Sequence, residues 1–320
     1  MTRYILRRLL WAVVLLVLVS ALTFVVFDVM PAADPAVLRA GRNATPETIA
    51  AIRHDLGLDQ PITVQFWQYL KGVFLHFDFG YSYTSNTSVR EQILSHLPAT
   101  LSLTAGAACV WLLFGLPIGI VSALRPGSLR DRVLMGGALV LMSAPPYFLA
   151  LAALYLVSDD LGKVPLLPGA DSYTGLTASP GQWFASLVLP WLVLGAGFVA
   201  IYARLLRGSL RETMATDYVR TARAKGLSER RVLVRHGLRS AITPLVTMLG
   251  LDIGVLLGGA VLVERVFDIP GIGRLGYEAI THGDYPTIQG TVLFAAMFVI
   301  VANAIVDIAY ALLDPRVVYE

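Results

Sequence analysis

The sequence predicts an all-α, polytopic membrane protein with six transmembrane helices. Of the 320 residues, 56% are hydrophobic and only 15% are Asp, Glu, Lys or Arg, whereas soluble domains carry about 25% charged residues. Six separate stretches approach the roughly 20 apolar residues that a spanning helix requires. The basic residues gather in alternate connecting loops, as expected when successive spans cross the bilayer in opposite directions.

The six apolar stretches cover residues 9–30, 99–124, 133–157, 186–206, 241–263 and 288–313. None alternates apolar and polar residues as a barrel strand does. Because backbone amides in lipid must pair within their own segment, we expect each stretch to be helical. The first is longer than the apolar core of a signal peptide, so we expect it to be retained as a helix.

Basic residues set the expected orientation, since short cytoplasmic loops are enriched in Lys and Arg. They occur before the first span, after the second and after the fourth, where ten lie between Arg204 and Arg239. Six alternating spans put all these segments on one side. We therefore expect a multi-pass protein of the cell (plasma) membrane with both termini in the cytoplasm.

This topology divides the chain into residues 1–30, an N-terminal transmembrane helix; 31–98, an extracytoplasmic segment; 99–313, a core transmembrane domain of spans 2 to 6; and 314–320, a cytoplasmic tail. In the outer segment, Thr45 and Ser88 are expected to cap helices and Gly57 to end one. We expect small helices packed on the outer membrane face.

Several residues inside the spans carry specific expectations. Pro117, Pro145 and Pro146 should kink or break their helices. The single cysteine, Cys109, cannot form an internal disulfide and is expected to pack as a small apolar residue.

Known catalytic and phosphate-binding patterns are missing from the sequence. It contains no G-x-x-x-x-G-K-[ST], H-E-x-x-H, C-x-x-C or G-x-S-x-G motif, and its five histidines are scattered outside the spans. We expect a non-catalytic chain that binds no metal, cofactor or nucleic acid and that lies in the lipid bilayer.

Polar and small residues within the last two spans have two interpretations each. Asp252, Asp307 and Asn303 are either part of a polar translocation path or interhelical contacts. Gly254 and Gly258, with Gly250 and Gly259, permit close helix packing or leave room on a pore-facing helix. Asp28 and Glu264 fall at span ends and are expected to be interfacial. The candidate path-lining residues are Asp252, Gly254, Gly258 and Asn303.

The basic loop of residues 204–240 shows a helix, turn and helix pattern. Gly226 suits the left-handed position that ends a helix, and Leu227 suits the apolar position after it. Ser228 can cap a second helix, with Glu229 at its positive end. Val232, Leu233 and Leu238 are available for burial. The pattern fits either contact with anionic lipid or docking to a protein.

The stretch "RTARAKGLSERRVLVRHGLRSAITP" resembles the EAA loop of permease subunits of ATP-binding-cassette (ABC) importers. Arg220, Thr221 and Ala222 occupy the E-A-A places and Gly226 the conserved glycine. His236 replaces an apolar residue of the general pattern, and Arg239 stands where proline is expected, departures that match the dipeptide, oligopeptide and nickel subfamily.

Other stretches resemble the first permease subunit of that subfamily. They are "YILRRLL", "FGYSY", "LVERVFDIPGIGRLGYEAI", "DYPTIQG" and "LDPRVVY", spread over nearly the whole chain. The resemblance implies a type I ABC importer fold in which this chain forms half of the translocation pathway for peptides. A nickel or metal-chelate permease of the same family is the alternative, and an autonomous secondary carrier or an intramembrane enzyme has less support.

The resemblance also implies partners: a second homologous permease, two ATPase subunits that bind ATP and Mg²⁺, and an extracytoplasmic solute-binding protein. The loop is then expected to form a short coupling helix that inserts into a groove on a separate ATPase subunit. The residues expected to couple this chain to the ATPase are Arg220, Thr221, Ala222, Arg223, Ala224, Lys225, Gly226, Leu227, Ser228, Glu229, Arg230 and Arg231.

Overall fold

The computed structural model describes residues 2–30, 34–40, 44–160 and 162–313, without the side chains of residues 2–5 and 307–313. In this part of the chain there is no strand, and two isolated β-bridges join Tyr81 to Ser88 and Ser158 to Leu167. The predicted all-α class is confirmed. The predicted tail, residues 314–320, and the side chain of Asp307 lie outside the described residues.

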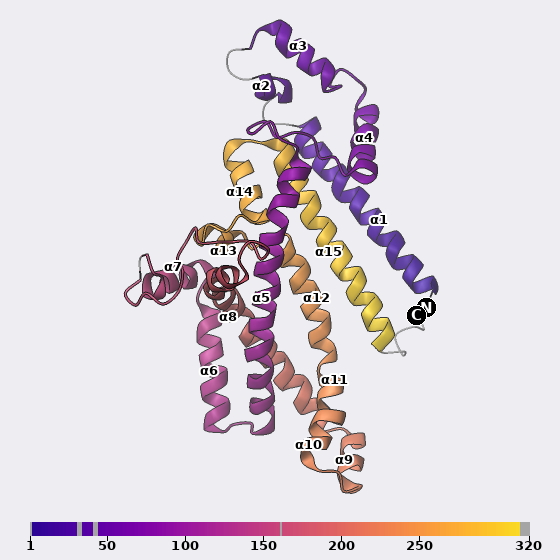
Figure 1. Cartoon of the computed structure of the whole chain (residues 1–320). Coiled ribbons are helices and arrows are strands. Elements are labelled where there is room, and N and C mark those ends of the chain that lie inside the picture. Colours follow the sequence, from indigo (N-terminus) through magenta and orange to yellow (C-terminus); the bar gives the residue numbers. More distant parts are fainter. Residues whose placement is uncertain (1, 31–33, 41–43, 161, 314–320) are drawn as a thin grey trace.

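Four helices are individually long and apolar enough to span a membrane (Figure 1). They are α1 (Thr2–Phe24, continued by a π-helical segment Val25–Val29), α5 (Val89–Leu124), α8 (Pro180–Met214) and α15 (Tyr285–Leu313). Two bent helix pairs raise the number of spans among the described residues to as many as six.

The first bent pair replaces the single helix expected over residues 133–157. Helix α6 (Leu129–Ser143) and helix α7 (Pro146–Val157) meet at an angle of 100°. Pro145 and Pro146 cause the break, because proline lacks an amide hydrogen and disfavours helical backbone in the residue before it. The break predicted at these prolines is confirmed.

The second bent pair corrects the span expected over residues 241–263. Residues Glu229–Ala241 form helices α10 (Glu229–Arg231) and α11 (Arg239–Ala241) around a π-helical segment, and they meet α12 (Thr243–Leu257) at 46°. Helix α12 stops before Gly258 and Gly259, and α13 (Val261–Val266) is separate. Gly259 has a φ of 120°, and a Cβ there would lie 2.4 Å from Gly273 Cα, so the chain turns sharply.

Helix α5 also differs from the expectation, because it continues through both Pro98 and Pro117. A kink or a break was expected at Pro117, and the helix does not break there. Proline is tolerated within a transmembrane helix because neighbouring helices can satisfy the freed backbone groups. Ser88 occupies the N-cap position as predicted, but its side chain makes no capping hydrogen bond. Cys109 is exposed on α5, so the expected packing role within this chain is wrong.

Three short helices form one end of the molecule before α5 begins: α2 (Pro35–Ala40), α3 (Pro46–Asp55) and α4 (Ile62–Lys71) (Figure 1). Thr45 caps α3, accepting a hydrogen bond from the Thr48 amide at 3.3 Å, and Gly57 follows it at a φ of 67°. The aromatic rings of Phe66 and Tyr69 lie 5.2 and 5.6 Å from that of Phe24, which attaches α4 to α1.

The main core lies between α5 and α8. Trp111, Tyr202 and Leu206 are fully buried there, and the rings of Trp111 and Phe198 are 4.5 Å apart. Close approach of the two helices depends on Gly119, where an added Cβ would lie 2.8 Å from the Ala203 carbonyl oxygen. This rigid pair positions the segments that follow α8.

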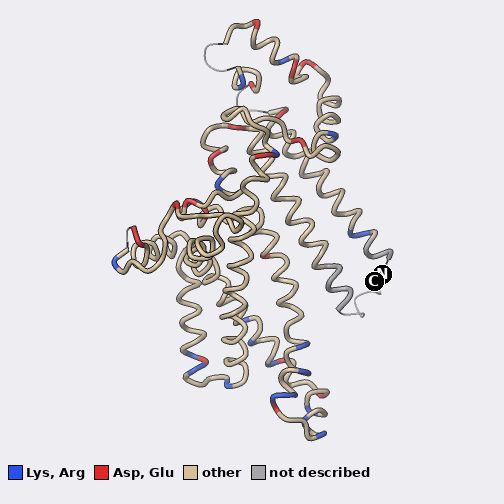
Figure 2. Tube along the Cα trace, viewed as in Figure 1, with Lys and Arg blue, Asp and Glu red and all other residues tan. Residues whose placement is uncertain are grey.

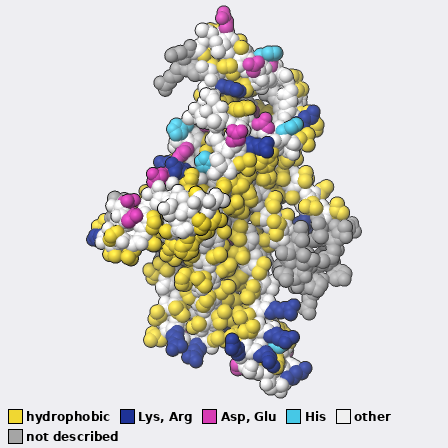
Figure 3. Space-filling view, viewed as in Figure 1, with side chains coloured by type: hydrophobic (Ala, Val, Ile, Leu, Met, Phe, Trp, Pro, Cys, Tyr) yellow, Lys and Arg dark blue, Asp and Glu magenta, His cyan; other side chains and the backbone are white. Residues whose placement is uncertain are grey.

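Charges are distributed unevenly between the two ends. Lys and Arg gather at the end formed by α9 (Asp217–Ala224), α10 and the loop between α5 and α6, while most acidic residues lie nearer the opposite end (Figure 2). Hydrophobic side chains cover the middle of the visible face (Figure 3). An apolar belt with a basic end is the pattern of a membrane protein with positive cytoplasmic loops.

Candidate coupling and translocation site

The predicted helix, turn and helix is present at the basic end. Helix α9 begins after Thr216 and presents Val219 and Ala222 inward, where they are 0% and 6% exposed. These two side chains and Val232 form a small apolar cluster that also contacts Met214 and Leu227. The cluster holds α9 against the segment that follows it.

Gly226 makes the turn with a φ of 79°. Nothing lies within 4 Å of a Cβ placed on it, so the left-handed backbone, and not a lack of space, favours glycine here. The Gly226 amide donates to the Arg223 carbonyl at 2.9 Å and the Leu227 amide to the Ala222 carbonyl at 3.4 Å. These bonds close the end of α9 as expected for an apolar residue after the glycine.

The second half of the loop begins at Ser228, which takes the N-cap position without a side-chain capping bond. Arg223 and Glu229 form an ion pair across the turn, with Nε and Oε1 2.8 Å apart. The Tyr218 hydroxyl donates to the His236 carbonyl at 3.3 Å, joining α9 to the π-helical segment Val232–Leu238. The loop is therefore a folded unit.

Most of the predicted coupling residues lie on the outer surface of this unit, together with Asp217, Tyr218, Val234 and Arg235. Of the coupling residues, Ala222 is buried and Leu227 is half-buried; the exposed ones are Arg220, Thr221, Arg223, Ala224, Lys225, Gly226, Ser228, Glu229, Arg230 and Arg231. The surface is small, basic and carries a glycine at its tip.

An ion pair fixes the helices that carry this unit. Arg207 Nη2 of α8 lies 2.8 Å from Asp131 Oδ2 of α6, which also accepts the Gly127 amide at 2.8 Å. Asp131 is buried at the start of α6, where a carboxylate also suits the positive helix end. Sequence reading missed this pair, because nothing local links residues 131 and 207.

The four path-lining candidates fall on two sides of α12. Asp252 faces α8, where it accepts a hydrogen bond from the Tyr202 hydroxyl at 2.7 Å. Gly254 and Gly258 face α15, where added Cβ atoms would lie 2.8 Å from Ala302 Cβ and 3.0 Å from Ala295 Cβ. The glycines thus permit close packing of α12 on α15, as small residues do in membranes.

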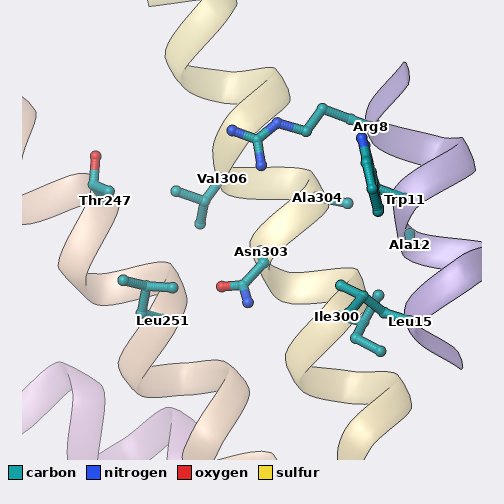
Figure 4. Close-up of a pocket in the computed structure, with 10 residues that line it drawn as sticks. All are labelled: Arg8, Trp11, Ala12, Leu15, Thr247, Leu251, Ile300, Asn303, Ala304 and Val306. Atoms are coloured by element: carbon teal, nitrogen blue, oxygen red, sulfur yellow. The ribbon is translucent and has the colours of Figure 1, made fainter. Parts of the chain in front are cut away.

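Asn303 lies on α15 beside a cavity of about 320 Å³ between α1, α12 and α15 (Figure 4). Its Oδ1 atom is buried without a hydrogen-bond partner in the described structure. Arg8 and Trp11 of α1 and Leu251 of α12 also line this cavity. The structure therefore separates Asn303 from Asp252, which faces a different helix.

Glu264 is a buried residue whose role sequence reading missed. It was expected at an interface, yet it is 0% exposed. Its carboxylate accepts hydrogen bonds from the Thr100 hydroxyl at 2.9 Å and the Arg274 amide at 2.8 Å. Burial raises the pKa of Glu264, and these hydrogen bonds act against that rise. The interfacial expectation is wrong because α13 packs against α7 and α14 (Ile272–His282), and Glu264 reaches α5 through Thr100.

The glycines of "PGIG" explain how a carboxylate is accommodated here. A Cβ on Gly271 would lie 2.3 Å from the Glu264 Cδ atom, and one on Gly273 would lie 2.9 Å from Oε2. Only glycine lets the backbone approach the carboxylate so closely. In the sequence, the two glycines that follow Glu264 by seven and nine residues were the signal that could have indicated a buried carboxylate here.

Another buried carboxylate, Asp284, joins distant segments at the end opposite the basic loop. Asp284 accepts hydrogen bonds from the Ser82 hydroxyl, from the Tyr83 amide at 3.0 Å and from the Thr287 hydroxyl at 2.8 Å. It therefore attaches the "FGYSY" segment to the start of α15. Both stretches contribute to the family resemblance, but no local pattern in the sequence links them.

A broken-helix membrane domain with a folded basic loop at one end has the architecture of a transporter permease. The chain matches the family described as binding-protein-dependent transport system inner membrane component over residues 115–319, and that family's N-terminal region over residues 1–104. It belongs to this family, and it is a permease subunit of an ABC importer of the inner membrane.

Full-length relatives support this assignment. The chain is 42% identical to the glutathione transport system permease protein GsiC of Salmonella choleraesuis over 320 residues, all of both chains. It is 40% identical to a putative peptide transport system permease protein of Brucella abortus, again over all of both chains.

A solved structure of the MetNI methionine ABC transporter shares the fold. The match has a TM-score of 0.54 at 18% identity and covers 69% of this chain and 96% of the other. The predicted type I importer fold is confirmed. Membership in this family implies ATPase and binding-protein partners.

Proposed function

We propose that this chain forms half of a pathway for short peptides and couples it to an ATPase subunit through the exposed surface of α9 and α10. The observation that supports this most directly is the folded loop, in which Val219, Ala222 and Val232 are buried while the other predicted coupling residues, apart from half-buried Leu227, are exposed. A solvated linker would need no such internal cluster.

The substrate class comes from two relatives whose names specify glutathione and peptides. Glutathione is itself a tripeptide, so a short peptide is the class that both names share. We infer a second homologous permease as the partner that completes the pathway, and two ATPase subunits that bind ATP and Mg²⁺. The binding protein delivers the peptide at the end opposite the basic loop, where α2, α3 and α4 lie.

ATP-driven closure of the ATPase subunits would move α9 and α10, and the ion pair between Arg207 and Asp131 would transmit that movement to α6 and α8. This is a switch between discrete states of the whole helix bundle. Asp252 and its Tyr202 partner lie on the α8 side, where we place the path.

A crosslinking experiment on the complete complex tests the docking surface. In a chain carrying Cys109→Ala, a cysteine at Ser228 should crosslink to an ATPase subunit, whereas one at Ser85, at the opposite end, should not. ATP-driven peptide uptake must be measured on the same samples. Normal uptake without any crosslink from Ser228 to the ATPase would refute the docking assignment.

A further inference from the structure

A second cavity, of about 630 Å³, lies between α6, α8 and α12 at the basic end. Most of its wall is apolar, including Met142, Ile201 and Met248, and it also contains Arg204 and Glu212. The cavity is distinct from the one beside Asn303, with which it shares no lining residue.

The two charged residues occupy one face of α8. Arg204, Gly208 and Glu212 follow each other at intervals of four residues, which places them in one row along the helix. Neither Arg204 nor Glu212 has an ion-pair partner among the described residues. The Arg204 guanidinium contacts the Met142 sulfur at 3.8 Å across the cavity.

The distance between Arg204 and Glu212 along α8 favours a ligand about as long as a tripeptide. Eight helical residues correspond to a rise of about 12 Å. An extended tripeptide places its terminal charges about 10 Å apart, and at neutral pH a free peptide carries an ammonium and a carboxylate group. The flexible Arg and Glu side chains can cover the remaining difference.

We propose that this cavity is a transit site for a short zwitterionic peptide. Arg204 receives the peptide carboxylate through paired N–H donors, Glu212 receives the ammonium group, and the apolar wall accommodates the side chains. The site rests on the peptide-transport function proposed above, and it adds the binding residues and a length preference.

One predicted path residue, Asp252, lies on the same face of α12 as this cavity. Pro244 and Met248 of α12 line it, and Asp252 follows at the next four-residue interval on the same face. Asp252 bonds to Tyr202 of α8, so α8 and α12 form one surface from the cavity toward the middle of the bundle.

Gly208 provides a way to close the site without disturbing the helix. A Cβ placed on it meets no atom within 4 Å, so a larger side chain projects into the cavity. Gly136 on α6 is equally open and does not line the cavity, which makes it a matched control.

The test uses the complete transporter in vesicles, with its binding protein, ATP and the photoreactive tripeptide alanyl-p-benzoylphenylalanyl-alanine. During uptake, the label should attach to Met142, Ile201 or Met248. Gly208→Phe, Arg204→Gln and Glu212→Gln should each reduce this labelling about tenfold, the factor expected for a lost charged hydrogen bond or a blocked site. Gly136→Phe should leave it unchanged.

A charge exchange separates binding from folding. Glu212→Arg alone should lower labelling, and the double change Arg204→Glu with Glu212→Arg should restore much of it, because the peptide can bind in the reversed direction. Wild-type uptake with label elsewhere, including on a partner permease that fills the cavity, would overturn the site. No ATP-driven uptake of the tripeptide by the wild-type complex would refute the proposed function, and this site with it.

Discussion

Glu264 connects three segments through a single buried carboxylate. It accepts from Thr100 of α5 and from the Arg274 amide of α14, while Thr100 accepts the Ile272 amide at 2.8 Å. Each group therefore depends on the others, since a buried polar atom without a partner costs about 1–3 kcal/mol. This network supports the turn between α13 and α14.

Replacing Thr100 with Val should destabilise the protein by about 1–3 kcal/mol, because the change keeps the shape but removes both hydrogen bonds. Unfolding of the detergent-solubilised protein would measure the loss. Thr281→Val, at an exposed threonine of α14, is the control and should change stability by less than about 0.5 kcal/mol. Equal stability of the Thr100→Val protein and the wild type would show that the network contributes nothing.

At the scale of helices, the elements end where glycine or proline forces a change of direction. Pro145 and Pro146 separate α6 from α7, Gly258 and Gly259 separate α12 from α13, and Gly226 separates α9 from α10. Proline alone does not decide the outcome, because α5 continues through Pro98 and Pro117. Packing of α5 against α8 maintains that helix across both prolines.

Gly226→Val tests the coupling turn. Valine is unfavourable at a φ of 79°, because its branched Cβ conflicts with the left-handed backbone. We expect about a tenfold or greater loss of peptide uptake and of peptide-stimulated ATP hydrolysis at normal membrane levels, from roughly 1–3 kcal/mol of local strain. Gly175→Val, at an open glycine outside the loop, is the control.

Persistence of both activities in the Gly226→Val transporter, with the altered chain still assembled in the complex, would show that the turn does not couple ATP hydrolysis to transport. Failure of the chain to reach the membrane would be detected by immunoblotting. Gly226→Ala would then provide a milder version of the same change, since alanine strains a left-handed turn less than valine.

Local signals explain what the sequence could predict. The helical class, the approximate spans, the Thr45 cap and the Gly226 turn all depend on neighbouring residues or on hydrophobic length. The hydrogen bonds of Glu264, Asp131 and Asp284 join residues that lie between 76 and 202 positions apart in the sequence. No local pattern in the sequence predicts such long-range contacts. The break at Pro145 and Pro146 was predictable, but its angle of 100° and the 46° bend before α12 depend on how neighbouring helices pack.

For the molecule as a whole, the separation of charge defines a direction across the membrane. The basic end carries α9, α10 and the loop after α5, and the other end carries α2, α3 and α4 (Figure 2). A docking site for an ATPase must face the cytoplasm, where ATP is available, and a binding-protein site must face the opposite side. The charge pattern and the proposed docking surfaces therefore require the same orientation.

Labelling of single cysteines would establish this orientation directly. Cys109 is the only cysteine of the chain, so Cys109→Ala gives a cysteine-free background. In intact spheroplasts, a membrane-impermeant maleimide should react with a cysteine at exposed Ser85 and not with one at exposed Gly127, because the basic end faces inward. Permeabilised membranes should allow both to react. Labelling of the Gly127 position, and not the Ser85 position, from outside would reverse the orientation and exclude ATPase docking at α9 and α10.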